Sequence, residues 1–425
     1  MAPARDRPHN PIAVTGMGIV TPLGIGKADN WQRLTSGHSG IRRISRFSTS
    51  GLRTTIAGTV DFVPVEPFTS AGLAERLAAL AVEEAITEAA IGAIGDFPGP
   101  LFLAVAPVET EWSHREAISV ESRSNGDVSY DSLLREVAKG HYIAIHERCM
   151  FASVAENIAV RFGTKGSPVS LSTACASGAS AIQLGVEAIR RGETDVALCA
   201  GADGSVNAES LIRFSLLSAL SMSNDLPEAA AKPFSKNRDG FVMAEGAGAL
   251  VLESLEHAKA RGARILGVIE GLGEMADSFH RTRSSPDGKP IIGCIRNALA
   301  DAGLDPIDID YVNPHGTGTP ENDKMECLGL TAVFGTRVKS IPVSSNKSMI
   351  GHTLSAAGVI EAVVSLLTIQ HQRLPPTINY QIPDPIIALD VVPNVARDAK
   401  VSHVLSNSFG FGGQNVSLVL GPEPK

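Results

Sequence analysis

The run Ser172-Thr-Ala-Cys-Ala-Ser-Gly-Ala-Ser-Ala181 places a cysteine, Cys175, at the junction of two patterns. Residues 167–171 before it have the pattern of a short buried strand, and residues 176–190 after it are first small and then apolar at helical spacing. The sequence therefore predicts a strand-to-helix turn, in which the unpaired N–H groups and the dipole of the helix stabilise a thiolate. The small neighbours leave the sulfur approachable, as in a nucleophile elbow.

The other four cysteines lack such a pattern. Free cysteine usually packs as a small apolar side chain, and this is the interpretation for Cys199, which lies in an apolar run, and for the isolated Cys149, Cys294 and Cys327. Scattered cysteines without paired spacing indicate a reducing compartment, in keeping with a cytoplasmic location, and no zinc site.

Two histidines in glycine-rich runs are the candidate partners of Cys175. His315 lies in Asn313-Pro-His-Gly-Thr-Gly-Thr-Pro320, after an alternating pattern at residues 307–312 that predicts a strand. His352 lies between a strand predicted to end near Ser345 and a helix predicted from about residue 355 through 370. Active sites of layered α/β proteins collect at strand ends. His280 stays undecided from its own surroundings, and the remaining histidines are interpreted as surface or structural residues: His9, His38, His114, His141, His146, His257, His371 and His403.

A last motif, Leu405-Ser-Asn-Ser-Phe-Gly-Phe-Gly-Gly-Gln-Asn415, interleaves three glycines with two phenylalanines. Glycine permits positive φ and close approach of the backbone, so a loop of this composition could aim an N–H group at a substrate oxyanion. An ordinary tight turn is the alternative.

Length and composition bound the class of protein. The 425 residues suffice for two domain-sized halves, and 44% hydrophobic residues with 41 glycines fit a large, well-buried α/β protein. The net charge of −8 argues against a nucleic-acid binder. The polar, proline-bearing residues 1–11 do not resemble a signal peptide, and no uncharged apolar run reaches the roughly 18 residues of a membrane span.

A faint internal repeat predicts how the chain is divided. Residues 12–18 are echoed by residues 267–273, and residues 246–253 by residues 412–421. The turn at Cys175 and the turn at residues 347–352 each join a strand to an apolar helix. We therefore expect a tail at residues 1–11, a half at 12–255 that carries Cys175, and a similar half at 256–425 that carries both histidines.

Taken together, these motifs resemble the β-ketoacyl-[acyl carrier protein] synthases, the decarboxylating condensing enzymes of the thiolase superfamily. The cysteine run, the His-Gly-Thr-Gly-Thr-Pro run, the Asn-Lys-Ser…Gly-His run and the Gly-Phe-Gly-Gly run follow one another in the order of that family. Residues 12–24 resemble its opening strand, and residues 232–248 its mid-chain signature. The resemblance implies an α/β fold of five layers, αβαβα, built from two similar halves.

The resemblance also implies roles for single residues. Cys175 would hold the acyl chain, and His315 and His352 would donate hydrogen bonds to the thioester oxygen of a malonyl group. The family's scheme uses no metal or organic cofactor; its partners are an acyl carrier protein and a second copy of the chain, paired through central strands. The other residues carried over are Lys347 and Glu361 as charged support, the backbone N–H groups of Cys175 and Phe411 for the oxyanion, Phe411 also as a gate, and Thr317, Thr319 and His280 as substrate-binding residues.

Several departures from the family bear on its substrate. The segment from Ala104 to Ile158 does not match the family, Ser218 stands where an arginine that docks the carrier is common, and Gln414 replaces a common threonine. These differences predict a specialised chain length or carrier. The sequence leaves two pathways open, fatty-acid elongation and a polyketide-type ketosynthase with the same chemistry, while Cys175 argues against a non-elongating partner subunit.

Overall fold

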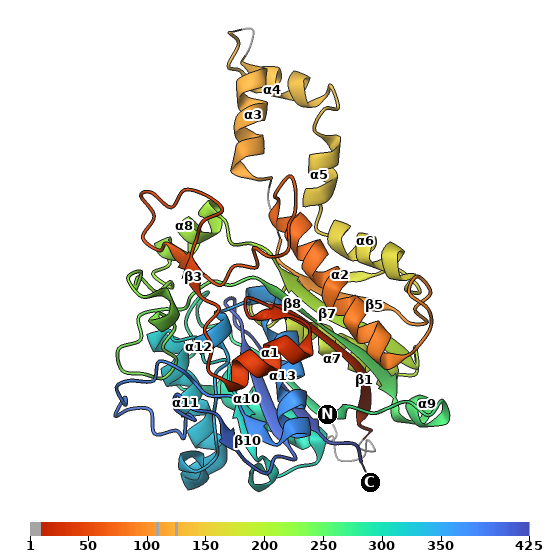
Figure 1. Ribbon diagram of the computed structural model, residues 1–425, viewed down its shortest axis with the longest axis vertical. Coiled ribbons are helices and arrows are strands. Elements are labelled where there is room, and N and C mark those ends of the chain that lie inside the picture. The colour runs from red at the N-terminus through yellow and green to blue at the C-terminus, as the bar shows by residue number, and fades with distance from the viewer. Residues whose placement is uncertain (1–9, 108–109, 124–125, 425) are drawn as a thin grey trace.

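The computed structural model describes residues 10–107, 110–123 and 126–424, so most of the predicted tail at residues 1–11 lies outside the described residues. Its strands form one continuous path in the order β10-β13-β14-β9-β1-β8-β7-β5-β6 (Figure 1). Where the halves meet, β1 pairs antiparallel with β8 along most of its length and with β9 over Ile12–Val14. The strands are β1 (Ile12–Thr21), β5 (Leu101–Val105), β6 (Val169–Leu171), β7 (Val196–Asp203), β8 (Gly246–Ser254), β9 (Gly267–Ala276), β10 (Tyr311–Asn313), β13 (Val404–Phe409) and β14 (Gln414–Gly421).

Helices cover both faces of each half of this path, which gives the five predicted layers. Helices α2 (Ser70–Ala89) and α6 (Ser153–Phe162) lie outside the strands of the first half. Helices α10 (Lys289–Ala302) and α11 (Pro320–Phe334) form the opposite outer layer. Between the two sets of strands, α7 (Ser177–Arg190) packs against α13 (Ala357–His371). The αβαβα fold expected from the sequence is thus confirmed.

The smaller elements connect these layers. They are β2 (Gly24–Ile25), α1 (Lys27–Thr35), β3 (Arg42–Arg43), β4 (Ile56–Ala57), α8 (Ala208–Leu216), α9 (Leu255–Ala260), α12 (Lys347–Ile350), β11 (Arg373–Leu374) and β12 (Arg397–Asp398).

One pair of equivalent glycines, Gly18 and Gly273, explains why the repeat was visible in the sequence. A Cβ atom at Gly18 would lie 1.9 Å from the carbonyl oxygen of Ala81 on α2, and one at Gly273 would lie 2.0 Å from that of Cys294 on α10. In each half, glycine therefore lets an outer helix pack directly on the backbone of a strand. We propose that the chain divides into two halves near residue 255, and the equivalent glycine contacts support this proposal.

The order of the strands supports the same proposal. The first half runs β6-β5-β7-β8-β1, and the second runs β10-β13-β14-β9 with Val343 bridged in parallel to Val312 at its outer edge. Val343 thus takes the place that β6 has in the first half. Cys175 follows β6, and His352 follows Val343, so the two turns occupy equivalent positions.

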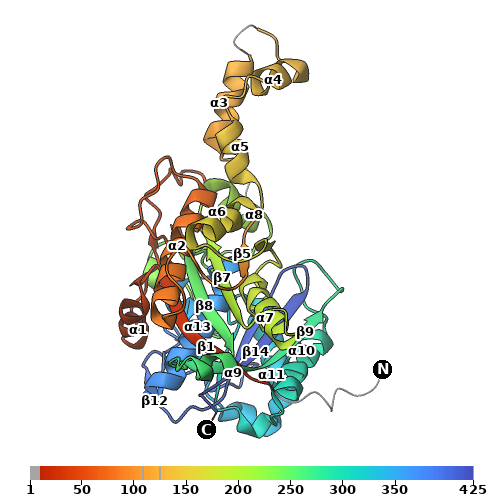
Figure 2. The ribbon, with the colours of Figure 1, turned by 90° about the vertical axis from the view of Figure 1, so that its right-hand side faces the viewer.

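Part of the segment at residues 104–158 forms a helical arm, made of α3 (Trp112–Ser122), α4 (Tyr130–Val137) and α5 (Ile143–Cys149). The arm projects away from the layered body in both views (Figures 1 and 2). Two contacts hold its base: Arg115 pairs with Glu209 at 3.2 Å, and the backbone N–H of Ser70 donates to Glu111 at 2.7 Å.

Two local expectations are corrected by the structure. The strand before Cys175 is an edge strand in which Val169 is 38% exposed, so it is not buried. The alternating pattern at residues 307–312 is a 3-10 turn, Pro306–Asp308, and strand β10 begins only at Tyr311. The segment Leu354–His371 is long and apolar enough to cross a membrane, but it contains the charged residue Glu361 and 89% of it is buried inside the molecule, as in a core helix.

Candidate active site

Cys175 lies in a tight turn between β6 and α7, as predicted. The turn is closed by backbone hydrogen bonds from Ala176 to Thr173 (3.2 Å) and from Ser177 to Ala174 (3.1 Å). Ala174 has a φ of 51°, a value in the left-handed region that a side chain other than glycine's seldom adopts. Strain of this kind directly before a nucleophile fits a functional turn.

The resting state of the sulfur differs from the expectation of a stabilised thiolate. Burial raises the pKa of the Cys175 thiol to about 11, and this outweighs the opposing effects of a backbone hydrogen bond from Phe411 and the charge of Lys347. Desolvation penalises the charged form more than the helix terminus favours it. The resting residue is therefore a neutral thiol that already meets the Phe411 N–H group.

His315 is positioned by a buried carboxylate. The backbone N–H groups of His315 and Gly316 both donate to Glu326 on α11, each at 2.8 Å. Burial lowers the pKa of His315 well below its usual value, and the charges of Lys347 and His352 lower it further. The imidazole is therefore neutral at pH 7.

His352 is oriented by its own backbone. The N–H group of Leu354 donates to the Nδ1 atom of His352 at 3.3 Å, which places the ring proton on Nε2. That Nε2 atom is buried and has no hydrogen-bond partner among the described residues. Burial, and then the charge of Lys347, lower the pKa of His352 well below its usual value. A neutral N–H donor is thus left without an acceptor inside the site.

The three side chains meet although they come from distant parts of the chain. The sulfur of Cys175 and ring nitrogens of His315 and His352 lie within 4.8 Å of one another. The two rings stand edge to face, with 5.2 Å between their centroids. A sulfur and two nitrogens at this spacing could also ligate a soft metal ion, and no other ligand-type cluster with buried members only is found among the described residues.

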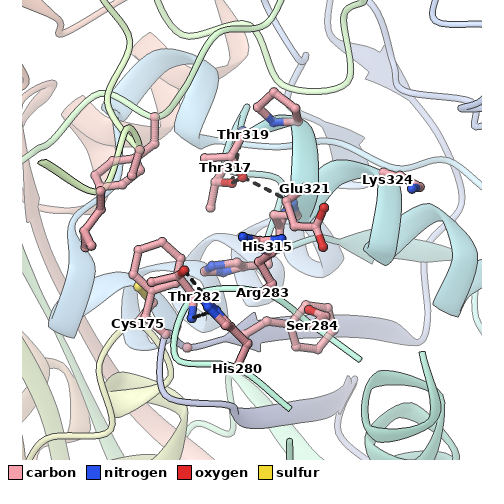
Figure 3. Close-up of a pocket in the computed structure, with 18 of the residues that line it drawn as sticks. Cys175, His280, Thr282, Arg283, Ser284, His315, Thr317, Thr319, Glu321 and Lys324 are labelled. Atoms are coloured by element: carbon pink, nitrogen blue, oxygen red, sulfur yellow. Dashed lines mark hydrogen bonds between the residues drawn. The ribbon is translucent and has the colours of Figure 1, made fainter. Parts of the chain in front are cut away.

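A cavity of about 570 Å³ leads from these residues to the surface (Figure 3). Phe409 and Phe411 line it near the cysteine, and Thr317 and Thr319 line it further along. His280, undecided from the sequence, is an exposed residue that lines the same cavity. The cavity thus gives a long substrate a path to the buried thiol.

Comparisons with known proteins agree with this arrangement. Residues 9–93 and 108–258 match the family described as "Beta-ketoacyl synthase, N-terminal domain", and residues 266–381 match "Beta-ketoacyl synthase, C-terminal domain". The chain belongs to the β-ketoacyl synthase family. It is an acyl-transferring condensing enzyme.

Relatives of this ketosynthase fall in two pathways. A 3-oxoacyl-[acyl-carrier-protein] synthase 2 of Coxiella burnetii is 37% identical over 96% of this chain and 98% of its own length. A putative polyketide beta-ketoacyl synthase 1 of Streptomyces cyaneus is 37% identical over 97% and 98%. Among solved structures, a ketosynthase of a type II polyketide synthase in complex with its acyl carrier protein is 32% identical over 98% of this chain and 100% of that one, with a TM-score of 0.85. A beta-ketoacyl synthase from Burkholderia phymatum, also 32% identical over 98% and 100%, has a TM-score of 0.83.

The two predicted supporting charges form a buried ion pair. Lys347 Nζ contacts Glu361 Oε1 inside the ketosynthase. Burial raises the pKa of Glu361 to about 7, against the effect of Lys347. The pair lies close enough to both histidines for the charge of Lys347 to lower the pKa of each.

Two threonines that line the cavity are hydrogen-bonded to each other and to the backbone. The hydroxyls of Thr317 and Thr319 are 2.9 Å apart. Thr319 also caps α11, because its hydroxyl accepts the Asn322 N–H at 3.2 Å. The Thr317 hydroxyl likewise accepts the backbone N–H of Thr319 at 3.3 Å, so each threonine has one backbone partner.

Sequence reasoning missed Glu326, which is fully buried and shapes the His315 loop. It also missed Asp323, which accepts the backbone N–H groups of Phe234 (2.7 Å) and Gly318 (3.2 Å). Both acids lie on the buried side of α11, and the only signal was their three-residue spacing directly after the His-Gly-Thr-Gly-Thr-Pro run. Burying a carboxylate is costly unless it is hydrogen-bonded, so acids in this position indicate a structure that they organise.

Proposed function

We propose that this ketosynthase extends an acyl thioester by two carbons in fatty-acid biosynthesis, through decarboxylative condensation of acyl-[acyl carrier protein] with malonyl-[acyl carrier protein]. The observation that carries the proposal is the meeting of Cys175 with His315 and His352 within 4.8 Å at the inner part of an open cavity. A nucleophile that holds the acyl group and two neutral donors for an enolate are what this reaction needs.

In the first step, the sulfur of Cys175 attacks the carbonyl carbon of the acyl thioester. A bond from that carbon to Cys175 forms, the bond to the carrier's sulfur breaks, and the thiol proton leaves with the carrier thiol. The backbone N–H groups of Cys175 and Phe411 hold the oxyanion. The hydrogen bond that Phe411 directs at Cys175 in the resting enzyme supports this role.

In the second step, malonyl-[acyl carrier protein] loses carbon dioxide, and the electron pair of the broken bond forms an enolate. The ring N–H groups of His315 and His352 donate to the enolate oxygen. The carbanion attacks the acyl-cysteine, a carbon–carbon bond forms, and the Cys175 sulfur is released. The loss of carbon dioxide drives the step, so the scheme uses no metal or organic cofactor.

The surrounding residues take positioning roles in this proposal. Burial is the main reason that both imidazoles stay neutral, and the positive charge of Lys347 in the Lys347–Glu361 pair lowers their pKa further. Thr317, Thr319 and His280 line the path of the pantetheine chain, and Phe411 gates the access to the sulfur.

A polyketide-type ketosynthase is the second candidate. The relatives from the two pathways are equally similar to this chain, at 37% identity. The two candidates share the chemistry of Cys175, His315 and His352 and differ in the acyl group that the cysteine receives.

We further propose a specialised chain length or carrier, a homodimer, and a cytoplasmic location. The specialisation rests on the helical arm, which lies in the region that the family resemblance assigns to the acyl pocket, and on Ser218, which lines the cavity. A carrier partner is supported by the similar ketosynthase solved with its acyl carrier protein. The five free cysteines support a reducing compartment.

The acyl group trapped on Cys175 tests the proposal. We expect acylated carrier protein to label Cys175 alone, and Cys175→Ala to lose condensation altogether. Intact-protein mass spectrometry across an acyl series, with the housekeeping carrier and any carrier encoded nearby, reports both the reaction and its range. A hydrophobic pocket discriminates by about 1–3 kcal/mol per methylene, so the preference should be graded.

Cys199→Ala is the matched control, because Cys199 is fully buried against the central helices and away from the cavity lining. Labelling of Cys199 or Cys327 in place of Cys175 would overturn the assignment. An optimum at medium chains on the housekeeping carrier would refute the specialisation and leave an ordinary elongation enzyme.

A further inference from the structure

The charge of the cavity lining differs between the inner part, around the reacting residues, and the rim. Inside, Cys175, His315 and His352 are buried and uncharged at pH 7. At the outside, the cavity lining includes Arg281 and Arg283, both exposed. Figure 3 shows Arg283 on the same loop as His280 and Thr282. Positive charge is thus concentrated where a substrate enters.

Lys324 adds a third cation from another element. It is an exposed residue of α11 and lines the same cavity (Figure 3). None of the three cationic side chains has a hydrogen bond or an ion pair with another described residue. Two carboxylates line the cavity as well: Glu321, one turn earlier on α11, and Asp277, which is buried at the base of the loop with the arginines.

The loop that carries the two arginines is held in place. Asp277 accepts the N–H groups of Phe279 (3.0 Å) and Ser285 (2.7 Å), which closes the rim loop, residues 277–285. The carbonyl of Arg281 accepts the N–H of Gly412 at 2.8 Å, so the rim loop is fastened to the loop of Phe411. The backbone under both cations is therefore fixed by the protein rather than by a ligand.

We propose that Arg281, Arg283 and Lys324 form a phosphate subsite, which binds the phosphodiester that joins the pantetheine chain to the carrier protein. The inference deepens the proposed function and rests on it. The acyl chain, the thioester and the two amides of a carrier-borne substrate are uncharged, and the phosphodiester is the anion at its outer end. Arginine matches phosphate oxygens with paired N–H donors, and lysine adds a point charge.

The subsite also accounts for the missing arginine at position 218. Ser218 lines the cavity, at the position where the family resemblance implies an arginine that docks the carrier. In this chain the positive charge comes instead from the rim loop and α11. Both belong to the second half of the chain, and the rim loop is hydrogen-bonded to the loop of Phe411.

Two small substrates that differ only in the phosphate test the subsite. Hexanoyl-pantetheine and hexanoyl-phosphopantetheine carry the same thioester, and the initial rate of Cys175 acylation is followed by intact-protein mass spectrometry. Charge-assisted hydrogen bonds correspond to on the order of 10- to 100-fold in rate, so we expect the wild type to favour the phosphorylated substrate by about tenfold or more. The double variant Arg281→Gln/Arg283→Gln should lower this ratio to about twofold, the remainder being due to Lys324.

Arg264→Gln is the matched control, since Arg264 is exposed and does not line the cavity; it should keep the wild-type ratio. Glu321→Gln should raise the ratio, because it removes the carboxylate of the rim. Equal wild-type rates on the two substrates, or a ratio unchanged in the double variant, would overturn the subsite. Failure of both substrates and of acylated carrier protein to label Cys175 would instead overturn the proposed function.

Discussion

Burial sets the protonation state of each residue at the centre of this site. The same desolvation that raises the pKa of the Cys175 thiol lowers the pKa of both imidazoles. Neutral histidines suit the donation of hydrogen bonds to an enolate, whereas a neutral thiol must lose its proton as it attacks. The site is thus arranged around decarboxylation, and the acylation step depends on the local help of Phe411 and Lys347.

The separate roles of the cysteine in acyl transfer and of the histidines in decarboxylation can be tested. We expect His315→Ala and His352→Ala to retain acyl transfer to Cys175 and to lose carbon dioxide release from malonyl-carrier protein, each by about 100- to 1000-fold, because each removes one donor to the enolate. Acylation is measured by mass spectrometry and carbon dioxide release in a separate assay.

His38→Ala is the control for this comparison, as His38 is exposed and does not line the cavity. A histidine variant that releases carbon dioxide normally and fails only in acylation would contradict the assigned role.

Among single residues, the sequence predicted those site residues whose flanking sequence has a recognisable pattern. Cys175, His315 and His352 each sit in a run of small residues or glycines, because tight turns need them, and such runs can be seen without a structure. Glu326 could not be found in that way. Its partners are backbone N–H groups ten and eleven residues away, and a single acid in a helix carries no pattern.

At the scale of the elements, two helix N-termini bring the site together. Helices α7 and α13 approach most closely at Gly178 and Gly358, where a Cβ on Gly358 would lie 2.4 Å from the backbone nitrogen of Ala179. A Cβ on Gly178 would lie 2.7 Å from the backbone nitrogen of Val359. Cys175 directly precedes α7, and His352 precedes α13, so this contact fixes their separation.

Gly358→Ala should therefore destabilise the protein and displace the reacting groups. Overpacking of a close contact costs about 1–3 kcal/mol, more than the roughly 1 kcal/mol that alanine contributes to helix propensity. We expect a lower midpoint of thermal unfolding and a condensation rate reduced by at least about tenfold, since the two groups must meet within a fraction of an ångström.

Gly293→Ala on α10 is the matched control. Its added Cβ would meet only the side chain of Met275, which can move aside, so its unfolding midpoint should stay near that of the wild type. A Gly358→Ala protein as stable and as active as the control would show that the helix contact does not set the site.

The helices were predicted more accurately than the strands, because their apolar pattern extends over more residues. The helix expected at residues 176–190 is observed as Ser177–Arg190, and the one expected at about 355–370 as Ala357–His371 after a 3-10 turn. The misjudged strands are short. A pattern of five or six residues does not tell an edge strand from a central one, or a 3-10 turn from a strand, because the distinction is made by neighbours far along the chain.

For the whole molecule, the helical arm and the edge strand β6 are the two features that point to a partner. The arm leaves large apolar side chains on its surface, with Trp112 64% exposed, Tyr130 72% and Ile143 58%. Strand β6 is at the outer end of the strand order, with one open edge. Exposed apolar patches and open edges of this kind mark interfaces. The departure from the family expected at residues 104–158 is corrected by the comparison, because the family's N-terminal domain matches residues 108–258. The sequence gave no direction to the arm, since a projecting segment has few contacts that fix a pattern.

The expected partner is a second copy of this chain, paired along β6 with the arm of each copy lying on the other. A two-fold axis would cover both open edges at once and would bury the apolar arm, which a monomer leaves in water. We expect light scattering of a concentrated sample to give twice the 44.5 kDa of one chain. Val169→Lys, which puts a charge on the edge strand, and Tyr130→Asp, which puts one on the arm, should each shift the particle toward the monomer.

Val160→Lys on α6 is the control, because Val160 is 83% exposed and lies on neither the edge nor the arm. A wild-type particle of one chain's mass would refute the dimer, and a stable pair with a different subunit purified from the source would assign the arm to that partner instead.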